Sequence, residues 1–255
     1  MNLKKRLDVL LVERGLASSR EKAQALILAG NVLVNNEPAE KVGLRYGVGE
    51  NIRVRGEVSK FVGRGGDKIE PAFEFFGINL NGVVALDVGA STGGFTDCML
   101  QRGAKMVYAV DVGYNQLAHK LRTDARVVVY EKTHAKDLAR LNFKPQPEFA
   151  TIDVSFIGVR KVLGYVVELF RNFEAQPYFS IAEKKLGILA LVKPQFELGQ
   201  KFISKGGVVK EEQAQLEAVK LVQEYAQSLG LVVANSFACP LRGEKSGNQE
   251  YFLYM

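Results

Sequence analysis

The chain has 255 residues, of which 47% are hydrophobic and 24% are charged, and its formal net charge at pH 7 is +6. These values are ordinary for globular proteins and argue against a disordered or fibrous chain, while the length allows one large domain or two unequal ones. The longest apolar run, residues 188–192, is far shorter than the roughly 18 residues of a membrane span, so we expect no membrane partner.

The amino-terminal residues 1–6 lack the apolar core of a signal peptide, which predicts a cytoplasmic protein. Two cysteines, Cys98 and Cys239, form no C-x-x-C pair, and the chain has only two histidines, His119 and His134. This set fits a reducing compartment and offers no zinc-ligand spacing, so we expect no metal site.

Most of the excess positive charge lies in the first quarter of the chain. Residues 1–64 contain 12 Lys and Arg against 7 Asp and Glu, whereas the remaining residues are nearly balanced. A basic surface on a folded segment is typical of proteins that bind polyanions such as nucleic acids. A basic face that serves only solubility is the alternative interpretation.

The first 58 residues are predicted to form a small α+β domain. Leucines at helical spacing predict a first helix over residues 4–14, and Gly15 marks its end. Ser18 lies three residues before Glu21, as in a capping box, and predicts a second helix that ends at Gly30. The β-branched runs that follow the second helix, 32–34 and 50–54, predict the strands of a small sheet.

Four short segments of this domain carry a resemblance: Arg6-Leu-Asp8, Gly15-Leu16, Ser19-Arg20 and residues 32–35. They resemble the RNA-binding domain named after ribosomal protein S4, in which a helix pair presents basic side chains to structured RNA. The resemblance implies that seven basic residues contact RNA: Lys4, Arg6, Arg20, Lys22, Arg53, Arg55 and Arg64. A DNA-binding helix-turn-helix is the alternative, but strands are predicted where its third helix would follow.

Residues 59–66 contain three glycines and predict a connection to a second domain at residues 67–255. Apolar runs alternate with helical stretches there, which is typical of an α/β fold with a mostly parallel sheet. The predicted strands are residues 83–88, 106–112, 127–130, 149–154 and 188–192. Ligands of such sheets bind at the carboxyl ends of the strands, so we expect the site there.

The first of these strands runs into residues 87–96, a glycine-rich turn that opens a helix. Its glycines follow a G-x-x-x-G-G pattern rather than the G-x-G-x-x-G pattern of dinucleotide sites, and Asp87 would repel a pyrophosphate. S-adenosylmethionine instead offers an ammonium group to Asp87 and a carboxylate to the helix amino terminus. We therefore expect this cofactor to contact Asp87, Gly89, Ser91, Gly93, Gly94 and Phe95.

Two later residues extend this predicted cofactor site. Asp111 ends the second strand, close to the roughly 20-residue spacing at which an acidic side chain binds a ribose in nucleotide folds. A role as a cap of the following turn is the alternative for Asp111. His134 follows the third strand, where we expect it to approach the adenine.

Four charged residues near the ends of predicted elements are candidates for catalysis: Lys68, Asp153, Lys193 and Glu250. A ribose hydroxyl is a poor nucleophile near neutral pH, and a lysine amine can take its proton when the surroundings favour the neutral amine. Carboxylates would orient the two lysines and balance their charge. Ordinary surface charges are the alternative for each residue taken alone.

Six motifs now carry a resemblance that covers nearly the whole chain: residues 64–68, 87–96, 153–157, 192–197, 205–207 and 247–252. The chain resembles the TlyA (hemolysin A-like) family, whose catalytic domain is similar to the FtsJ-type methyltransferases and has a Rossmann-like, class I fold. The resemblance implies a Lys68-Asp153-Lys193-Glu250 tetrad, with Lys193 acting on the 2′-hydroxyl. Glu244 is a rival for the last position, but it lies outside the matching motif.

The function that this resemblance implies is S-adenosylmethionine-dependent 2′-O-methylation of a ribose, expected to be a cytidine, in ribosomal RNA. The partners would be ribosomal RNA or ribosomal subunits, with the large subunit preferred and the small subunit as a second target. Two alternatives belong to other classes, a non-catalytic ribosome-assembly factor and a membrane-active hemolysin. The mean hydropathy of −0.02 and the absent export signal argue against the hemolysin.

Overall fold

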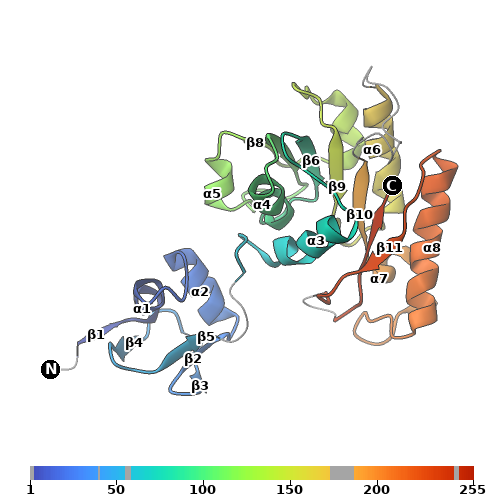
Figure 1. Cartoon of the computed structure of the whole chain (residues 1–255). Coiled ribbons are helices and arrows are strands. Elements are labelled where there is room, and N and C mark those ends of the chain that lie inside the picture. Colours follow the sequence, from blue (N-terminus) through green and yellow to red (C-terminus); the bar gives the residue numbers. More distant parts are fainter. Residues whose placement is uncertain (1–2, 40, 55–58, 173–186, 244–246) are drawn as a thin grey trace. The chain divides into compact units, whose positions relative to one another are not determined.

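The computed structural model divides into two compact units, Met1–Lys60 and Phe61–Met255, and each has its own hydrophobic core (Figure 1). The structure describes residues 3–39, 41–54, 59–172, 187–243 and 247–255.

In its described residues, the first unit contains two helices and two small sheets. Its elements are β1 (Lys4–Arg6), α1 (Leu7–Glu13), α2 (Arg20–Leu28), β2 (Val32–Val34), β3 (Glu37–Pro38), β4 (Arg45–Gly47) and β5 (Ile52–Val54). β1 pairs with β4, and β2 lies between β3 and β5. Leu7 and Leu11 of α1 pack with Ile27 of α2 and Val32 of β2 in a core that solvent does not reach.

Two predictions for this unit were wrong in detail. Residues 4–6, expected in the first helix, form β1 instead, because they pair antiparallel with Arg45–Gly47 and this pairing overrides local helical preference. The second helix is capped by Ser19 rather than Ser18, since the Ser19 hydroxyl accepts a hydrogen bond from the backbone N–H of Lys22. Each error concerns where a helix begins, and both helices are present.

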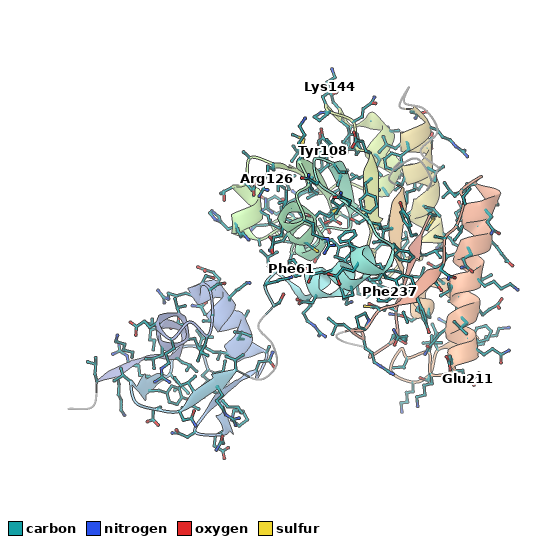
Figure 2. All side chains as sticks on the ribbon, in the orientation of Figure 1. Phe61, Tyr108, Arg126, Lys144, Glu211 and Phe237 are labelled. Carbon is teal, nitrogen blue, oxygen red and sulfur yellow. The ribbon has the colours of Figure 1, made fainter. Side chains whose placement is uncertain are left out.

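The connection expected at residues 59–66 extends into the second unit. Phe61 is buried against Ile69 and Phe95, and its side chain can be followed in Figure 2. α3 (Arg64–Phe75) begins within the expected connection. The second unit therefore starts before residue 67, where the sequence pattern placed its boundary.

The second unit is a seven-stranded sheet with helices on both faces, which confirms the predicted α/β class. Its further elements are β6 (Val84–Val88), α4 (Gly94–Gln101), β7 (Met106–Val110), α5 (His119–Arg122), β8 (Val127–Tyr130), η1 (Ala135–Arg140), β9 (Phe149–Ile152), α6 (Arg160–Asn172), β10 (Ile188–Val192), α7 (Pro194–Glu197), η3 (Gln200–Phe202), α8 (Glu212–Ser228), β11 (Ser236–Ala238) and β12 (Tyr251–Tyr254). Strand side chains alternate between a core under α6 and α8 and a second core under α3 and α4.

The strand order, β11-β12-β10-β9-β6-β7-β8, places the first strand of the unit in the middle of the sheet. The strands from β10 to β8 are parallel, and the chain leaves β6 first in one direction and later in the other. A crevice forms at the carboxyl ends of strands where the order reverses, which here is between β6 and β9. This is the edge at which the predicted site residues lie.

The sequence pattern did not predict the antiparallel edge of the sheet. β12 pairs with β10 in the register Val192 to Tyr251, and β11 pairs with β12. This register sets Glu250, just before β12, opposite Lys193, just after β10. The carboxyl-terminal strand thereby carries one charged residue to the same edge as the parallel strands.

No helix in the described part of the chain combines the length and apolarity needed to cross a membrane. Among the described residues, no three His, Cys, Asp or Glu side chains gather as metal ligands. Cys98 and Cys239, both in the described part of the chain, are buried and form no disulfide bond.

Candidate active site

The four residues expected to act in catalysis come from four elements and meet at the carboxyl edge of the sheet. Asp153 directly follows β9 and Lys193 directly follows β10, which are neighbouring parallel strands. Lys68 lies in the second turn of α3, and Glu250 precedes β12. Glu244, the rival of Glu250, lies outside the described residues.

These residues form two ion pairs of low exposure. Lys68 Nζ lies 2.7 Å from Glu250 Oε2, and the two side chains are only 12% and 4% exposed. Lys193 Nζ lies 2.5 Å from Asp153 Oδ1 and also donates a hydrogen bond of 2.9 Å to the Ser155 hydroxyl. Each lysine therefore has a carboxylate partner, which offsets the cost of burying its charge.

Asp153 Oδ1 is a buried oxygen with an incomplete set of partners. It is close to Lys193, yet within the described ranges no group donates it a hydrogen bond of good geometry. Buried polar atoms are normally satisfied, so this oxygen depends on the nearby Lys193 charge. The rest of the Asp153 side chain is accessible, since the side chain as a whole is 22% exposed and lines the pocket. Asp153 is the carboxylate of the site that is most open to a substrate.

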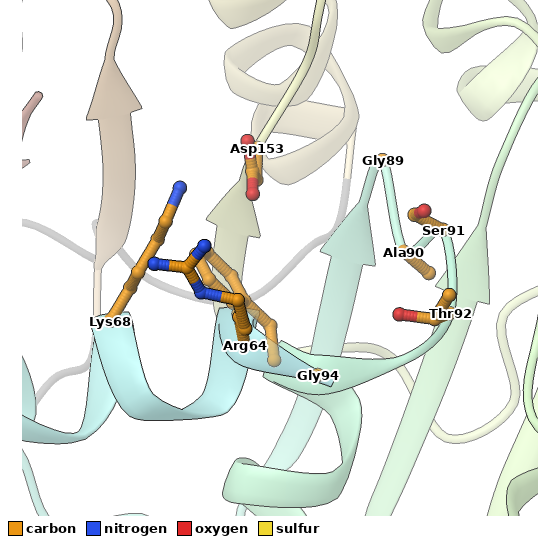
Figure 3. A pocket seen from close by; sticks show the side chains of 10 residues that line it. Arg64, Lys68, Gly89, Ala90, Ser91, Thr92, Gly94 and Asp153 are labelled. Carbon is orange, nitrogen blue, oxygen red and sulfur yellow. The ribbon is translucent and has the colours of Figure 1, made fainter. Parts of the chain in front are cut away.

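A pocket of about 260 Å³ joins the glycine loop to this charged group (Figure 3). Its lining residues are Arg64, Gly65, Lys68, Gly89, Ala90, Ser91, Thr92, Gly94, Phe95 and Asp153. In Figure 3 the side chains of Arg64 and Lys68 rise from α3 on one side, and the glycine loop closes the other. The pocket therefore unites residues that the sequence assigned separately to cofactor binding and to catalysis.

A contact between glycines fixes α3 beside the loop. A Cβ added at Gly94 would lie 2.8 Å from the Gly66 nitrogen and 2.9 Å from the Gly65 Cα. No side chain larger than hydrogen fits between these backbones, so the amino termini of α3 and α4 approach closely. Lys68 is one turn further along α3, and its position depends on this approach.

Both helices begin at the pocket without a side-chain cap. The residue before α3 is Gly63 and the residue before α4 is Gly93, and neither has a side chain that can accept from the first N–H groups. Helix amino termini attract anions through these N–H groups and the helix dipole. Arg64 at the same wall adds positive charge, so this end of the pocket suits a carboxylate.

Asp87 differs from our expectation of a direct contact with the cofactor ammonium. Its carboxylate is fully buried beneath the loop and accepts hydrogen bonds from the hydroxyls of Thr96 at 2.6 Å and Thr151 at 2.9 Å. Burial raises the pKa of Asp87 to about 6, although the two hydroxyls oppose this shift. Asp87 therefore ties the helix after the loop to β9, and it does not line the pocket.

Asp111 supports the loop from the other side. One carboxylate oxygen accepts the N–H of Ser91 and the other accepts the N–H of Gly113, both at 2.7 Å. The alternative role that we considered, a cap of the following turn, is thus present. A carboxylate has about four acceptor positions, so it keeps capacity for a ribose hydroxyl.

His134 lies next to Asp111 in the chain fold. It is exposed and precedes η1, and the neighbouring Thr133 donates its N–H to the carbonyl of Asp111. The position is compatible with the expected contact to adenine, which stays a prediction.

The seven residues expected to bind RNA fall into several places. Arg6 and Arg20 meet at the buried carboxylate of Asp8. In the same unit Lys4 is exposed on β1, Lys22 donates to the Ser59 carbonyl, and Arg53 donates to Asn36. Arg55 lies outside the described residues, and Arg64 belongs to the second unit, where it lines the pocket.

Sequence reasoning overlooked Phe156 as a functional candidate. It is 90% exposed, lies three residues after Asp153 and contacts Phe196, with ring centroids 5.8 Å apart. Its φ of 66° is unusual for a phenylalanine, and such strain is common at functional sites. The signal was available in the motif Asp153-Val-Ser-Phe156, where an aromatic follows polar residues at a strand end.

Comparison with known proteins identifies both units. A model of the FtsJ-like methyltransferase family matches residues 61–255, and a model of the S4 domain matches residues 5–52. YqxC of Bacillus subtilis, described as a candidate rRNA methyltransferase, is 42% identical over 253 residues, which span 99% of this chain and 85% of that protein.

Two further relatives are similar over nearly the whole chain. The 16S/23S rRNA (cytidine-2′-O)-methyltransferase TlyA of Mycobacterium tuberculosis is 41% identical over 251 residues, which span 98% of this chain and 89% of that protein. A solved structure of a candidate hemolysin from Streptococcus thermophilus is 36% identical, with a TM-score of 0.68, and covers 99% of this chain and 88% of its own. The chain therefore belongs to the FtsJ-like methyltransferases and, among them, to the TlyA (hemolysin A-like) family with an amino-terminal S4 domain.

Proposed function

We propose that this protein transfers a methyl group from S-adenosylmethionine to the 2′-hydroxyl of a cytidine in ribosomal RNA. The observation that carries the proposal is the pair of ion pairs, Lys68 with Glu250 and Lys193 with Asp153, beside the glycine-loop pocket. The activity named for the TlyA relative of Mycobacterium tuberculosis supports the same reaction and the choice of cytidine. Such a substrate places the reaction in the cytoplasm.

The pocket residues fit the charges of S-adenosylmethionine. The uncapped helix termini and Arg64 suit the carboxylate of the cofactor. On the protein side, the carboxylate of Asp153 faces the pocket. The volume of about 260 Å³ is below the roughly 300–1,000 Å³ of typical ligand clefts, so this pocket holds part of the cofactor. Asp111 and His134 would hold the nucleoside part on the neighbouring loops.

The chain's own residues would prepare the hydroxyl group for reaction. When bound, the cofactor supplies an electrophilic methyl group on a sulfonium, so no metal is required. Lys193 would first give its ammonium proton to water, and its Nζ would then take the proton of the 2′-hydroxyl. The carboxylate of Asp153, which lines the pocket, would accept a hydrogen bond from that hydroxyl beforehand. Asp153 and Ser155 hold the lysine in place during this transfer.

Lys68 and Glu250 have a supporting role in this scheme. Their ion pair is the less exposed of the two and links α3 to the strand opposite Lys193. Lys68 also lines the pocket, so this ion pair holds one wall of the site in place.

The decisive experiment determines which RNA atom receives the labelled methyl group. Purified protein is incubated with ribosomal subunits or naked ribosomal RNA and methyl-labelled S-adenosylmethionine, and the RNA is then digested with alkali. A 2′-O-methyl group blocks cleavage at its own nucleotide, so the label is expected in an alkali-resistant dinucleotide that begins with cytidine. Label in a base, or in no RNA, would overturn the proposal.

Two variants separate chemistry from binding. Lys193→Ala should abolish transfer while leaving cofactor affinity unchanged. Lys220→Ala, an exposed lysine on α8, is the matched control and should behave as the original protein does. RNA binding without any transfer would favour the assembly-factor alternative, and lysis of erythrocytes by purified protein would favour the hemolysin.

A further inference from the structure

The buried carboxylate of Asp8, in the first unit, accepts hydrogen bonds from five donors. Asp8 lies in the first turn of α1, and its side chain is inaccessible to solvent. Its oxygens accept from Arg6 Nε at 2.9 Å and Nη2 at 3.0 Å, from Arg20 Nη2 at 3.1 Å and from Gln24 Nε2 at 2.9 Å. A fifth donor is the backbone N–H of Val9 at 3.0 Å.

The two arginines in this cluster remain open to solvent on their outer sides. The side chains of Arg6 and Arg20 are 41% and 54% exposed, whereas that of Asp8 is 0% exposed. A guanidinium has five N–H donors, of which Arg6 uses two on Asp8 and Arg20 uses one. Each arginine therefore keeps donors that face outward from a fixed position.

The cluster also joins three elements. Arg6 ends β1, Asp8 lies in the first turn of α1, and Arg20 and Gln24 occupy neighbouring turns of α2. The Arg6 contact is bidentate, which restricts the orientation of the guanidinium plane more than a single bond does. These hydrogen bonds hold the pKa of Asp8 well below its usual range, so it is ionised at neutral pH.

We propose that Asp8 is a positioning residue for RNA binding, which holds Arg6 and Arg20 as a preorganised clamp for RNA phosphates. This inference rests on the proposed function of the first unit as an RNA-binding domain. An unconstrained arginine loses side-chain freedom when it binds, and prior fixation removes that loss from the binding step. Asp8 does not touch the RNA in this scheme, because the helices and the two arginines cover it.

Removal of the Asp8 charge should change RNA affinity in the direction opposite to that expected from net charge alone. Removing a negative charge beside a phosphate-binding surface should strengthen RNA binding if only net charge matters. If Asp8 positions the arginines, Asp8→Asn should instead weaken binding by about tenfold, because two long side chains become free. The slope of log affinity against log salt should stay close to its original value, since both positive charges remain.

The test uses the full-length protein and purified bacterial large ribosomal subunits, with dissociation constants measured by filter binding at two salt concentrations without S-adenosylmethionine. Gln24→Ala is the matched control, since it removes one donor to Asp8 and leaves both arginines in place. Unchanged or tighter binding by Asp8→Asn would overturn the proposal.

A thermodynamic cycle separates positioning from general stability. In the double variant Arg6→Ala/Arg20→Ala, adding Asp8→Asn should change RNA affinity by less than twofold, because the groups through which Asp8 acts are gone. A further tenfold loss in that background would point to structural damage and contradict the proposal. Thermal unfolding in the same buffer establishes that each variant is folded at the assay temperature.

Loss of the fold in Asp8→Asn would leave a second route. Arg6→Lys and Arg20→Lys keep the charge but lose the planar guanidinium that Asp8 orients. Each should weaken binding several-fold, and equal binding would refute the clamp. These binding assays involve no methyl transfer, so they test the role of Asp8 independently of the proposed reaction. A protein that binds RNA in this way but transfers no methyl group would refute the proposed activity alone.

Discussion

Lys68 Nζ and Glu250 Oε2 lie 2.7 Å apart although 182 residues separate them in the chain. The contact joins the first helix of the second unit to the residue before its last strand. Both side chains are nearly inaccessible, so their charges depend on each other for stability. Removing one partner or both should therefore affect stability and activity differently.

We expect Lys68→Met to lower the free energy of unfolding by about 3–5 kcal/mol, because Glu250 is then buried without a partner. The double variant Lys68→Met/Glu250→Leu should recover most of that loss and still transfer no methyl groups. Urea denaturation and the methyl-transfer assay measure the two effects. Equal destabilisation by the single and double variants would show that the pair is not coupled.

The close approach of the amino termini of α3 and α4 predicts that cofactor binding depends on the glycine at position 94. Gly94→Ala places a methyl group within 3 Å of the backbone at Gly65 and Gly66, so α3 must move away from the loop. We expect at least tenfold weaker binding of S-adenosylmethionine in isothermal titration calorimetry, even though alanine favours the helix itself. Gly199→Ala is the matched control, because a Cβ there meets no atom within 4 Å. Equal affinities in the two variants would contradict the role of this contact.

The buried carboxylate of Asp87 predicts a dependence on pH. Burial raises its pKa to about 6, above its value in the unfolded chain, so the folded state favours the protonated form. The contribution of Asp87 to stability is therefore greatest below about pH 4 and is lost as the pH rises through 6. Asp87→Asn does not ionise, so its stability relative to the original protein should increase by roughly 2–3 kcal/mol between pH 4 and pH 7.5. Chemical denaturation at both pH values measures this, and a constant difference would contradict the shifted pKa.

The exposed ring of Phe156 predicts a role in holding the substrate base. Aromatic side chains beside an RNA site stack on unpaired bases, and each such contact contributes about 1–3 kcal/mol. Phe156→Ala should therefore lower kcat/KM for RNA by about tenfold or more, without changing cofactor affinity or stability. Phe75→Ala, at another exposed phenylalanine, is the control. An unchanged kcat/KM would exclude stacking at this position.

Local patterns were sufficient to predict the class of the fold and several of its strands. The strands at Val127–Tyr130 and Ile188–Val192 begin and end where their apolar runs do. Ile188–Val192 is apolar throughout because a parallel strand inside the sheet is buried on both faces. The glycine loop was recognisable for a similar reason, since its spacing is dictated by the turn between β6 and α4. Where pairing partners decide the structure, as for β1 with β4, the local pattern misled us.

The sequence by itself determined which residue types are present at the ends of the strands, and so which chemistry to expect. Only the tertiary structure decided their partners, because ion pairs between residues far apart depend on strand order and register. The pairing of β12 with β10 brings Glu250 to the edge of Lys193, and no local signal encodes that pairing. Burial likewise assigned Asp87 to the interior and left Asp153 at the pocket, since alternation along a strand turns side chains to faces that only the packed helices define.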